Sequence, residues 1–142
     1  MAGLHKLISV TGKKSDNALV TWQRLKQQCD EALSKLSLLR DYCERYRTLL
    51  YSNLGEGMPA MSTMTYLGFI GQIEEVVLRQ EGEVGRLEAA CTAQWRELVE
   101  IRREKRVYEI VSERAAEREL AAALRSAQAE IDDMLQRVSK AP

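Results

Sequence analysis

The stretch from Asn53 to Met64, NLGEGMPAMSTM, decides the fold because it interrupts an otherwise helix-forming chain. Gly55, Gly57 and Pro59 lie close together in it, and Gly and Pro are the residues least compatible with a continuing helix. Long helix-forming sequence flanks the stretch on both sides, so burial of both apolar faces predicts an antiparallel helical hairpin. Either Ser62 or Thr63 has a hydroxyl suited to capping the second helix.

Apolar residues follow the chain on both sides of this turn at spacings that alternate between four and three residues. Because this spacing averages about 3.5 residues, close to the helical period, it predicts two seams that pack together as a left-handed coiled coil. The sequence therefore predicts an all-α fold, a long antiparallel two-helix coiled-coil hairpin in a single domain over 1–142. The first helix is expected at about 4–54, the turn at 55–61 and a longer second helix at about 62–139. The first seam consists of Ala18, Trp22, Leu25, Cys29, Ala32, Leu36, Leu39, Cys43, Tyr46 and Leu50; the second of Tyr66, Ile70, Ile73, Val77, Gln80, Val84, Leu87, Cys91, Gln94, Leu98 and Ile101.

The end of the second helix is predicted to extend beyond the first. If Leu50 lies opposite Ile70, Ala18 faces the region of Arg102, and residues beyond about Glu117 have no partner in the first helix. A new apolar stripe begins there and must be covered by the N-terminal arm, by another copy or by a different partner. The stripe contains Leu120, Leu124, Ala127, Ile131, Met134 and Val138.

The glycines and cysteines allow two interpretations each. Gly68, Gly71, Gly82 and Gly85 are costly inside a helix and would permit either close helix approach or local bending. The same register places Cys29 near Cys91, either as small core residues, which is the favoured interpretation, or as a redox pair.

Composition excludes several functional classes. The chain has 21 acidic residues and 21 Lys and Arg, whereas a nucleic-acid-binding protein is expected to carry a basic surplus. No stretch approaches the apolar length of a membrane span, and no secretory signal is predicted at the N-terminus. The three unevenly spaced cysteines fit neither a disulfide framework nor a zinc site, so the sequence favours a reducing cytosol.

Residues for catalysis are also missing from the sequence. His5 is the only histidine, which excludes a histidine-centred triad and a multi-histidine metal site. The pair Gly55 and Gly57 lacks the Lys and hydroxyl residue of a phosphate-binding loop. We therefore expect no catalytic residues, no metal and no cofactor, and a protein that is not an enzyme.

Apolar and aromatic residues near the turn also lie outside the seams. They either widen the seams or bind a partner, and the second interpretation is favoured because a two-helix hairpin has no third layer to cover them. The group contains Leu38, Tyr42, Leu49, Tyr51, Phe69, Val76 and Leu78. A basic cluster further along is either solvated or meets an acidic partner; it contains Arg102, Arg103, Lys105 and Arg106.

Several motifs occur in a distinctive order. The stretch DYCERYR at 41–47 is followed by the glycine turn, by YLGFIGQIE at 66–74, by Trp95 and by EIDDM at 130–134. In this order, and over nearly the whole chain, the sequence resembles the FliJ family of bacterial flagellar export proteins.

The resemblance implies a cytoplasmic component of the flagellar type III protein export apparatus, peripheral at the inner face of the cell membrane and needed for flagellum biogenesis and motility. Such proteins resemble the central stalk of rotary ATPases. They bind the hexameric ring of the export ATPase, promote its assembly and activity, and link it to the export gate in the membrane and to export chaperones.

The resemblance also implies which residues bind. The surface for the export gate would consist of Leu39, Tyr42, Tyr46, Phe69, Ile73, Val76 and Gln80. A stalk role makes the basic cluster and the terminal stripe candidate contacts of the ATPase, namely Arg102, Arg103, Lys105, Arg106, Leu120, Leu124, Ile131 and Met134. Two alternatives remain, a stalk protein of a virulence-type secretion system and a structural coiled coil that dimerises through its terminal helix.

Overall fold

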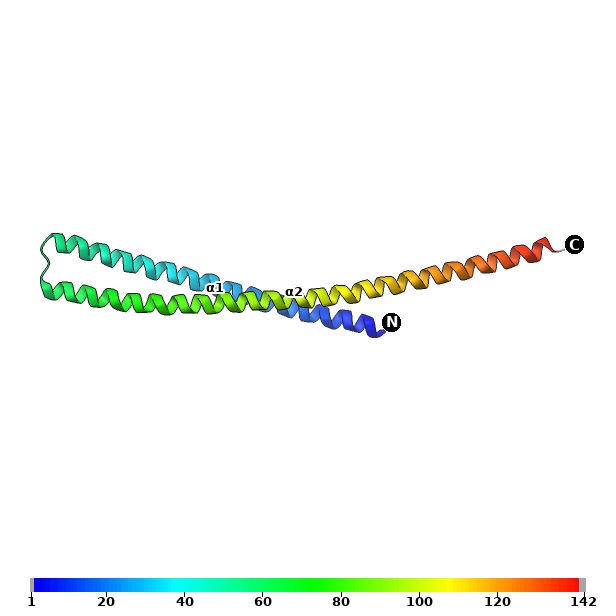
Figure 1. The fold of residues 1–142 in the computed structure, drawn as a ribbon, viewed down its shortest axis with the longest axis horizontal. Coiled ribbons are helices and arrows are strands. Elements are labelled where there is room, and N and C mark those ends of the chain that lie inside the picture. Colours follow the sequence, from blue (N-terminus) through cyan, green and yellow to red (C-terminus); the bar gives the residue numbers. More distant parts are fainter. Residues whose placement is uncertain (1, 141–142) are drawn as a thin grey trace. The chain divides into compact units, whose positions relative to one another are not determined.

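The computed structural model describes residues 2–140, which form two α-helices and, within that range, no strand (Figure 1). Helix α1, Ala2–Gly55, has 54 residues, and helix α2, Ala60–Ser139, has 80 residues. The two helices form a hairpin with a longer second helix, which confirms the predicted all-α fold. Helix α1 begins at Ala2 rather than near Leu4, and Gly12 does not interrupt it.

The turn ends α1 through a pair of backbone hydrogen bonds. The amide of Gly57 donates to the carbonyl of Leu54 at 3.2 Å, and the amide of Met58 donates to that of Asn53 at 3.1 Å. This Schellman arrangement needs a residue with left-handed backbone geometry, and Gly57, with φ of 88°, supplies it. The half-buried side chain of Met58 then packs onto the core, which holds the turn against the helices.

Helix α2 begins earlier than predicted because Pro59 stands at its start. The amide of Thr63 donates to the carbonyl of Pro59 at 3.1 Å, so the first turn of α2 already contains Ser62 and Thr63. The hydroxyl of Thr63 also donates to this carbonyl, at 3.2 Å, instead of accepting a bond from a first-turn amide. Neither predicted residue caps the helix. Proline is tolerated directly before the first helical residue because an amide there would have no acceptor within the helix.

The described chain divides into two compact units. The turn-side unit is Asn17–Leu98 and contains the turn. The terminal unit combines the described residues up to Asp16 with those from Val99 onward.

The predicted seams form the core of the turn-side unit. One cluster joins the two helices through Cys29, Ala32, Leu36, Val84 and Leu87; another, nearer the turn, contains Cys43, Leu50 and Ile70, with Tyr46, Tyr66 and Ile73 packed against it. Leu98 is completely buried, and the rings of Trp22 and Trp95 lie 4.9 Å apart.

The two polar seam residues are satisfied by backbone carbonyls of α1. The side-chain amide of Gln80 donates to the carbonyl of Ala32 at 2.9 Å, and that of Gln94 to the carbonyl of Ala18 at 3.3 Å. Both carbonyls belong to alanines, whose small side chains leave room for the glutamine. These bonds offset the cost of placing polar groups in a helix contact.

The register of the seams differs from the predicted one by about one helical turn. Ala18 was expected opposite Arg102, but Gln94 reaches Ala18, and Arg102 bonds to Ser15 instead. The compact turn explains the shift, because α2 begins before the predicted start and its residues pair with earlier positions of α1. Every described residue from Ala116 onward is exposed, close to the predicted limit at Glu117.

The same shift changes the surroundings of the cysteines. Cys29 packs in the cluster that contains Leu87, and all three cysteines are free thiols. Burial raises the pKa of Cys29, with smaller contributions from Glu88 and then Cys91. Cys29 is thus a small core residue, as the favoured interpretation held.

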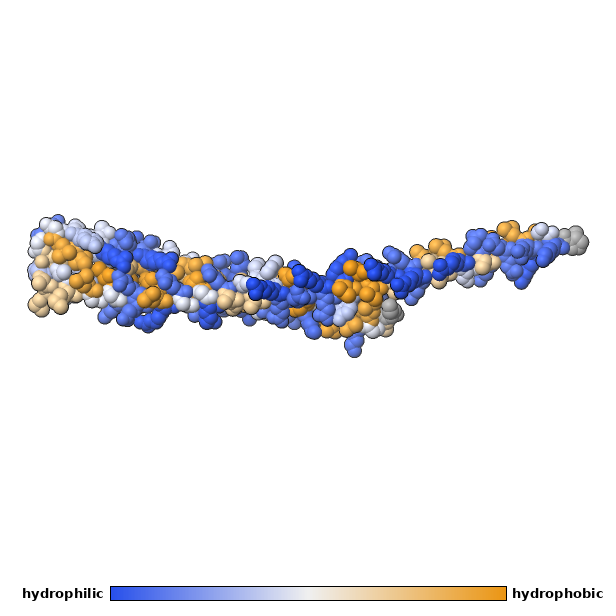
Figure 2. All heavy atoms as spheres, viewed as in Figure 1, coloured by the Kyte–Doolittle hydropathy of each residue, from blue (hydrophilic) through white to orange (hydrophobic). Residues whose placement is uncertain are grey.

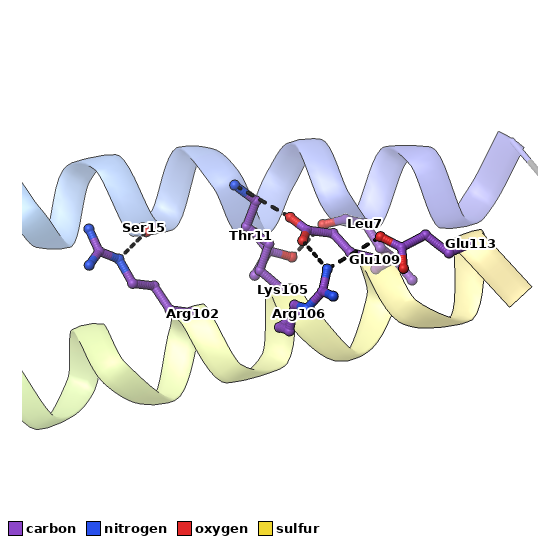
Figure 3. A network of polar contacts seen from close by, with 8 residues as sticks. All are labelled: Leu7, Thr11, Ser15, Arg102, Lys105, Arg106, Glu109 and Glu113. Atoms are coloured by element: carbon purple, nitrogen blue, oxygen red, sulfur yellow. Dashed lines mark hydrogen bonds and ion pairs between the residues drawn. The ribbon is translucent and has the colours of Figure 1, made fainter.

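The terminal unit has a polar contact between the helices where the turn-side unit has an apolar one. Its buried residues in the described range are Thr11 and Ser15. Arg102 Nε donates to Ser15 Oγ at 3.4 Å, and the Thr11 hydroxyl donates to the carbonyl of Leu7 (Figure 3). The side chain of Lys105 lies beside Gly12. This polar contact coincides with the lapse of the apolar pattern after Ile101.

Candidate partner-binding surfaces

The seam of the turn-side unit has two edges, and ion pairs between the helices mark one of them. Arg40 bonds to Glu81 at 2.9 Å and Arg47 to Glu74 at 2.5 Å. Each of these residues follows a seam residue by one position in its helix. We call Arg40, Arg47, Glu74 and Glu81 the ion-paired edge. Charged pairs at such positions are usual in coiled coils.

The other edge consists of residues that precede a seam residue by one position, and near the turn these are apolar. We call Tyr42, Leu49, Phe69 and Val76 the apolar edge. Their exposed fractions are 52%, 48%, 43% and 39%, so each keeps a large uncovered area in the described chain. Phe69 packs edge to face on Tyr46, with ring centroids 4.7 Å apart at 69°. Figure 2 shows hydrophobic residues gathered near the turn.

The residues that the family resemblance assigns to the export gate are brought together on this side. Tyr42, Phe69 and Val76 belong to the exposed apolar edge, whereas the remaining four are half-buried seam residues beneath it, namely Leu39, Tyr46, Ile73 and Gln80. The side-chain amide of Gln80 already donates to the carbonyl of Ala32, so Gln80 exposes mainly its aliphatic part on this surface.

The structure separates the larger off-seam group into two faces. Tyr51 and Leu78 each follow a seam residue by one position and so lie on the side of the ion-paired edge, although Leu78 was predicted to belong to the same group as Tyr42. Leu49 belongs to the apolar edge but was absent from the predicted gate surface. Its position one residue before the seam residue Leu50 is the signal that identifies it.

The basic cluster of the terminal unit is largely matched by acids of the same helix. Arg103 bonds to Glu100 at 2.7 Å, and Arg106 lies 3.3 Å from both Glu109 and Glu113 (Figure 3). Lys105 approaches Glu109 at 3.8 Å.

Nearby, the hydroxyl of Tyr108 donates to Glu104 at 2.8 Å, and this hydrogen bond to the neutral phenol raises the pKa of Tyr108. The acids of α2 therefore offset much of the positive charge around the predicted basic cluster. Any partner of this region meets a mixed surface rather than a purely basic one.

The terminal stripe is exposed along the whole described end of α2. Its predicted members Leu120, Leu124, Ile131, Met134 and Val138 are joined by Leu135, all with more than half of their surface uncovered. Hydrophobic residues accordingly recur along this part of α2 in Figure 2. The structure brings the stripe and the basic cluster into the same unit but shows no contact between them.

The described residues lack the features of two other kinds of site. No group of three or more metal-binding side chains occurs within residues 2–140. Neither helix, in the range described, combines the length and apolarity that crossing a membrane requires.

The fold and surfaces define a class, an antiparallel coiled-coil protein with exposed apolar surfaces. Comparison with protein families then identifies the family: the model described as "Flagellar FliJ protein" matches residues 1–141, and the chain belongs to the FliJ family. Members of this family are components of the flagellar export apparatus, which transports proteins. A search of curated proteins and a search of solved structures found no match.

Proposed function

We propose that this protein acts as a stalk-like coupling component of the flagellar export apparatus, which binds the export gate and the export ATPase through different units. The proposal rests on family membership together with one observation. Three residues that the family resemblance assigns to the gate, Tyr42, Phe69 and Val76, are members of the exposed apolar edge. Uncovered apolar residues gathered in this way are typical of protein-binding surfaces.

In this proposal the apolar edge binds the cytoplasmic part of the gate protein. Tyr42 and Phe69 are aromatic and half-exposed, and aromatic side chains bury a large area at little conformational cost. The half-buried residues Leu39, Tyr46 and Ile73 support them from the seam. The protein is then cytoplasmic and peripheral to the membrane through its gate contact, and export chaperones are further partners.

The terminal unit binds the ATPase ring in the same proposal. A single helix with one apolar stripe cannot contact six similar subunits equally, so each orientation of the helix favours a different state of the subunit it meets. Differential affinity of this kind is what couples a binding event to a conformational equilibrium. The protein thus acts on the ATPase by binding and performs no chemistry of its own.

Hydrolysis assays with the flagellar export ATPase test the ATPase contact. The full chain should increase the rate of ATP hydrolysis, and a chain that lacks the segment from Leu120 to Pro142 should not, because it has lost the stripe. Helical circular dichroism and the Trp22–Trp95 pair report that the shortened hairpin is intact. Undiminished stimulation would place the ATPase contact elsewhere.

Sedimentation discriminates the proposal from a structural coiled coil that dimerises through α2. A stalk is expected to be mainly monomeric at micromolar concentration, whereas a tight dimer that dissociates on removal of the terminal stripe would favour scaffolding.

Binding to the cytoplasmic part of the gate protein tests the apolar edge. Tyr42→Ala should weaken binding by about tenfold or more, the effect of losing an anchor worth about 1.4 kcal/mol. Leu78→Ala is the control, because Leu78 is also an exposed apolar residue, at 66% against 52% for Tyr42, but lies on the side of the ion-paired edge. Equal losses for both variants, or none for Tyr42→Ala, would exclude the apolar edge as the gate surface.

A further inference from the structure

The apolar edge carries apolar pairs at positions that usually carry charge. By the register of the seam, Leu49 lies level with Phe69, and Tyr42 lies level with Val76. On each helix the two residues are seven positions apart, which is the coiled-coil repeat. The ion-paired edge shows the usual arrangement at equivalent positions, with Arg40 bonded to Glu81 and Arg47 to Glu74.

Two parallel rows with this repeat form a second seam on the surface. A third helix placed along the apolar edge would insert its own apolar residues between the rows, as in a three-helix coiled coil. A hollow of about 270 Å³ lies at the same place and is lined by Tyr46, Thr65, Tyr66 and Phe69. It offers space for one apolar side chain of such a helix.

The basic side chains around the apolar edge favour an acidic partner. Lys35 continues the row of Tyr42 and Leu49, while Arg45 and Arg79 flank the rows on their outer sides. Asp41 and Glu44 line the same hollow as Arg45, but Lys35 and Arg45 form no ion pair with any residue of the described range. Arg79 approaches Glu75 only at 3.9 Å. The row of Phe69 and Val76 continues seven residues later with an acid, Glu83, and Arg86 already forms an ion pair with Glu83 at 2.5 Å.

We propose that the partner segment on the apolar edge is an acidic amphipathic α-helix, which packs along Tyr42, Leu49, Phe69 and Val76 as the third helix of a coiled coil. This inference rests on the proposed function of the edge as the gate surface and names the kind of segment that binds there. A second copy of this chain is a poorer occupant, because a twofold contact would bring Arg45 and Arg79 of both copies together.

Two synthetic peptides provide the test. Each has capped ends and about two heptads with leucine at the first and fourth positions; one carries glutamate at the flanking positions and the other lysine. Peptides of this length are largely unfolded alone, and like charges oppose their self-association. Calorimetry measures the affinity of each peptide for the full chain. The gain of helicity on binding is the circular dichroism of the mixture minus the sum of the spectra of the separate components.

The acidic peptide should bind at least about tenfold more tightly than the basic one and become helical on binding. Reversal of charge in Arg45→Glu with Arg79→Glu should invert this preference. The same change at two exposed arginines away from the apolar edge, Arg24→Glu with Arg96→Glu, should leave it unaltered. Tyr42→Ala should weaken binding of the acidic peptide.

Equal affinities, absence of binding by either peptide, or binding without a gain of helicity would overturn the inference. Dimers of the chain that are abolished by Tyr42→Ala would overturn it in favour of a second copy. The gate experiment separates this inference from the proposed function. If Tyr42→Ala weakens gate binding but the acidic peptide does not bind, the inference fails and the proposed function stands. If the acidic peptide binds but Tyr42→Ala leaves gate binding unchanged, the proposed function fails.

Discussion

At the scale of single residues, the glycines of this chain serve different purposes. Gly57 has a left-handed backbone that an L side chain rarely adopts, so the turn requires it. Gly68, Gly71, Gly82 and Gly85 have ordinary helical geometry and open space where a Cβ atom would stand. Close approach of the two helices, one of the two interpretations of these glycines, therefore does not occur at these four positions of the described chain.

Replacement of the helical glycines should stabilise the protein. Gly82→Ala and Gly85→Ala should each raise the free energy of unfolding by about 1 kcal/mol, because alanine loses less backbone entropy in a helix and meets no neighbour at these positions. Gly57→Ala is the contrasting variant and should lower it. Urea unfolding followed by circular dichroism measures both, and destabilisation by Gly82→Ala would show that a Cβ atom is not tolerated there.

The buried thiol of Cys29 should react slowly with alkylating agents. Its pKa is raised in the folded chain, chiefly by burial, so the reactive thiolate is disfavoured. The raised pKa of Cys29 also contributes to the free energy of unfolding. This contribution is fully present at pH values below the unfolded-state pKa and is lost as the pH rises through the raised folded-state pKa.

Single-cysteine variants allow this reactivity to be measured. At pH 9.0, the ordinary pKa of a cysteine thiol, the variant that retains Cys29 should react with iodoacetamide more slowly than the variant that retains the half-buried Cys91. Both rates should become equal in urea. Faster reaction of Cys29 in the folded chain would contradict its burial.

At the scale of elements, helix α2 is one continuous helix with two kinds of surroundings. Up to Leu98 it buries a seam against α1, and from Ala116 onward all of its described residues are exposed. A leucine side chain therefore contributes very differently to the free energy of unfolding at different places along α2. Leu98 has no exposed surface, whereas Leu124 has most of its surface uncovered.

Identical truncations in α2 should reveal this difference. Leu98→Ala should lower the free energy of unfolding by about 2–5 kcal/mol, since it removes buried atoms and leaves a cavity. Leu124→Ala should change it by less than about 0.5 kcal/mol because the side chain contacts little. Thermal and urea unfolding of the two variants provide the comparison. A similar loss in both would mean that the terminal stripe is covered in solution.

At the scale of the whole molecule, the two units differ in what holds their helices together. The turn-side unit contains both apolar clusters, and the buried residues of the terminal unit are Thr11 and Ser15 in the described range. Because apolar burial supplies most of the stability of a helix contact, the terminal unit should open more readily.

Hydrogen exchange measures this opening directly. Amides in Ala2–Asp16 and from Ala116 to Ser139 should exchange faster than those near Leu36, Leu50 and Val84. Mass spectrometry of peptic fragments resolves these regions. Addition of the ATPase should slow exchange from Ala116 onward if the proposed contact is correct, whereas uniform exchange along α2 would show that its two parts are equally stable.

The candidate surfaces were only partly predictable from the sequence. The off-seam residues near the turn were apparent as a group, since Tyr42 and Phe69 lie outside a clear heptad pattern. Their division between two edges was not, because it depends on how the seams face each other. The ion pairs Arg40–Glu81 and Arg47–Glu74 identify one edge and so assign Leu49 and Phe69 to the other.

The sequence by itself determined the helical hairpin, because a four-three apolar repeat and a glycine-proline break act locally, through the helical period and the backbone geometry of single residues. Only the tertiary structure decided the register, because that depends on how α1 ends at Gly57 and α2 begins at Pro59. A shift of one turn leaves the apolar pattern equally well matched but changes every cross-helix contact, including those of Gln80 with Ala32 and Arg102 with Ser15.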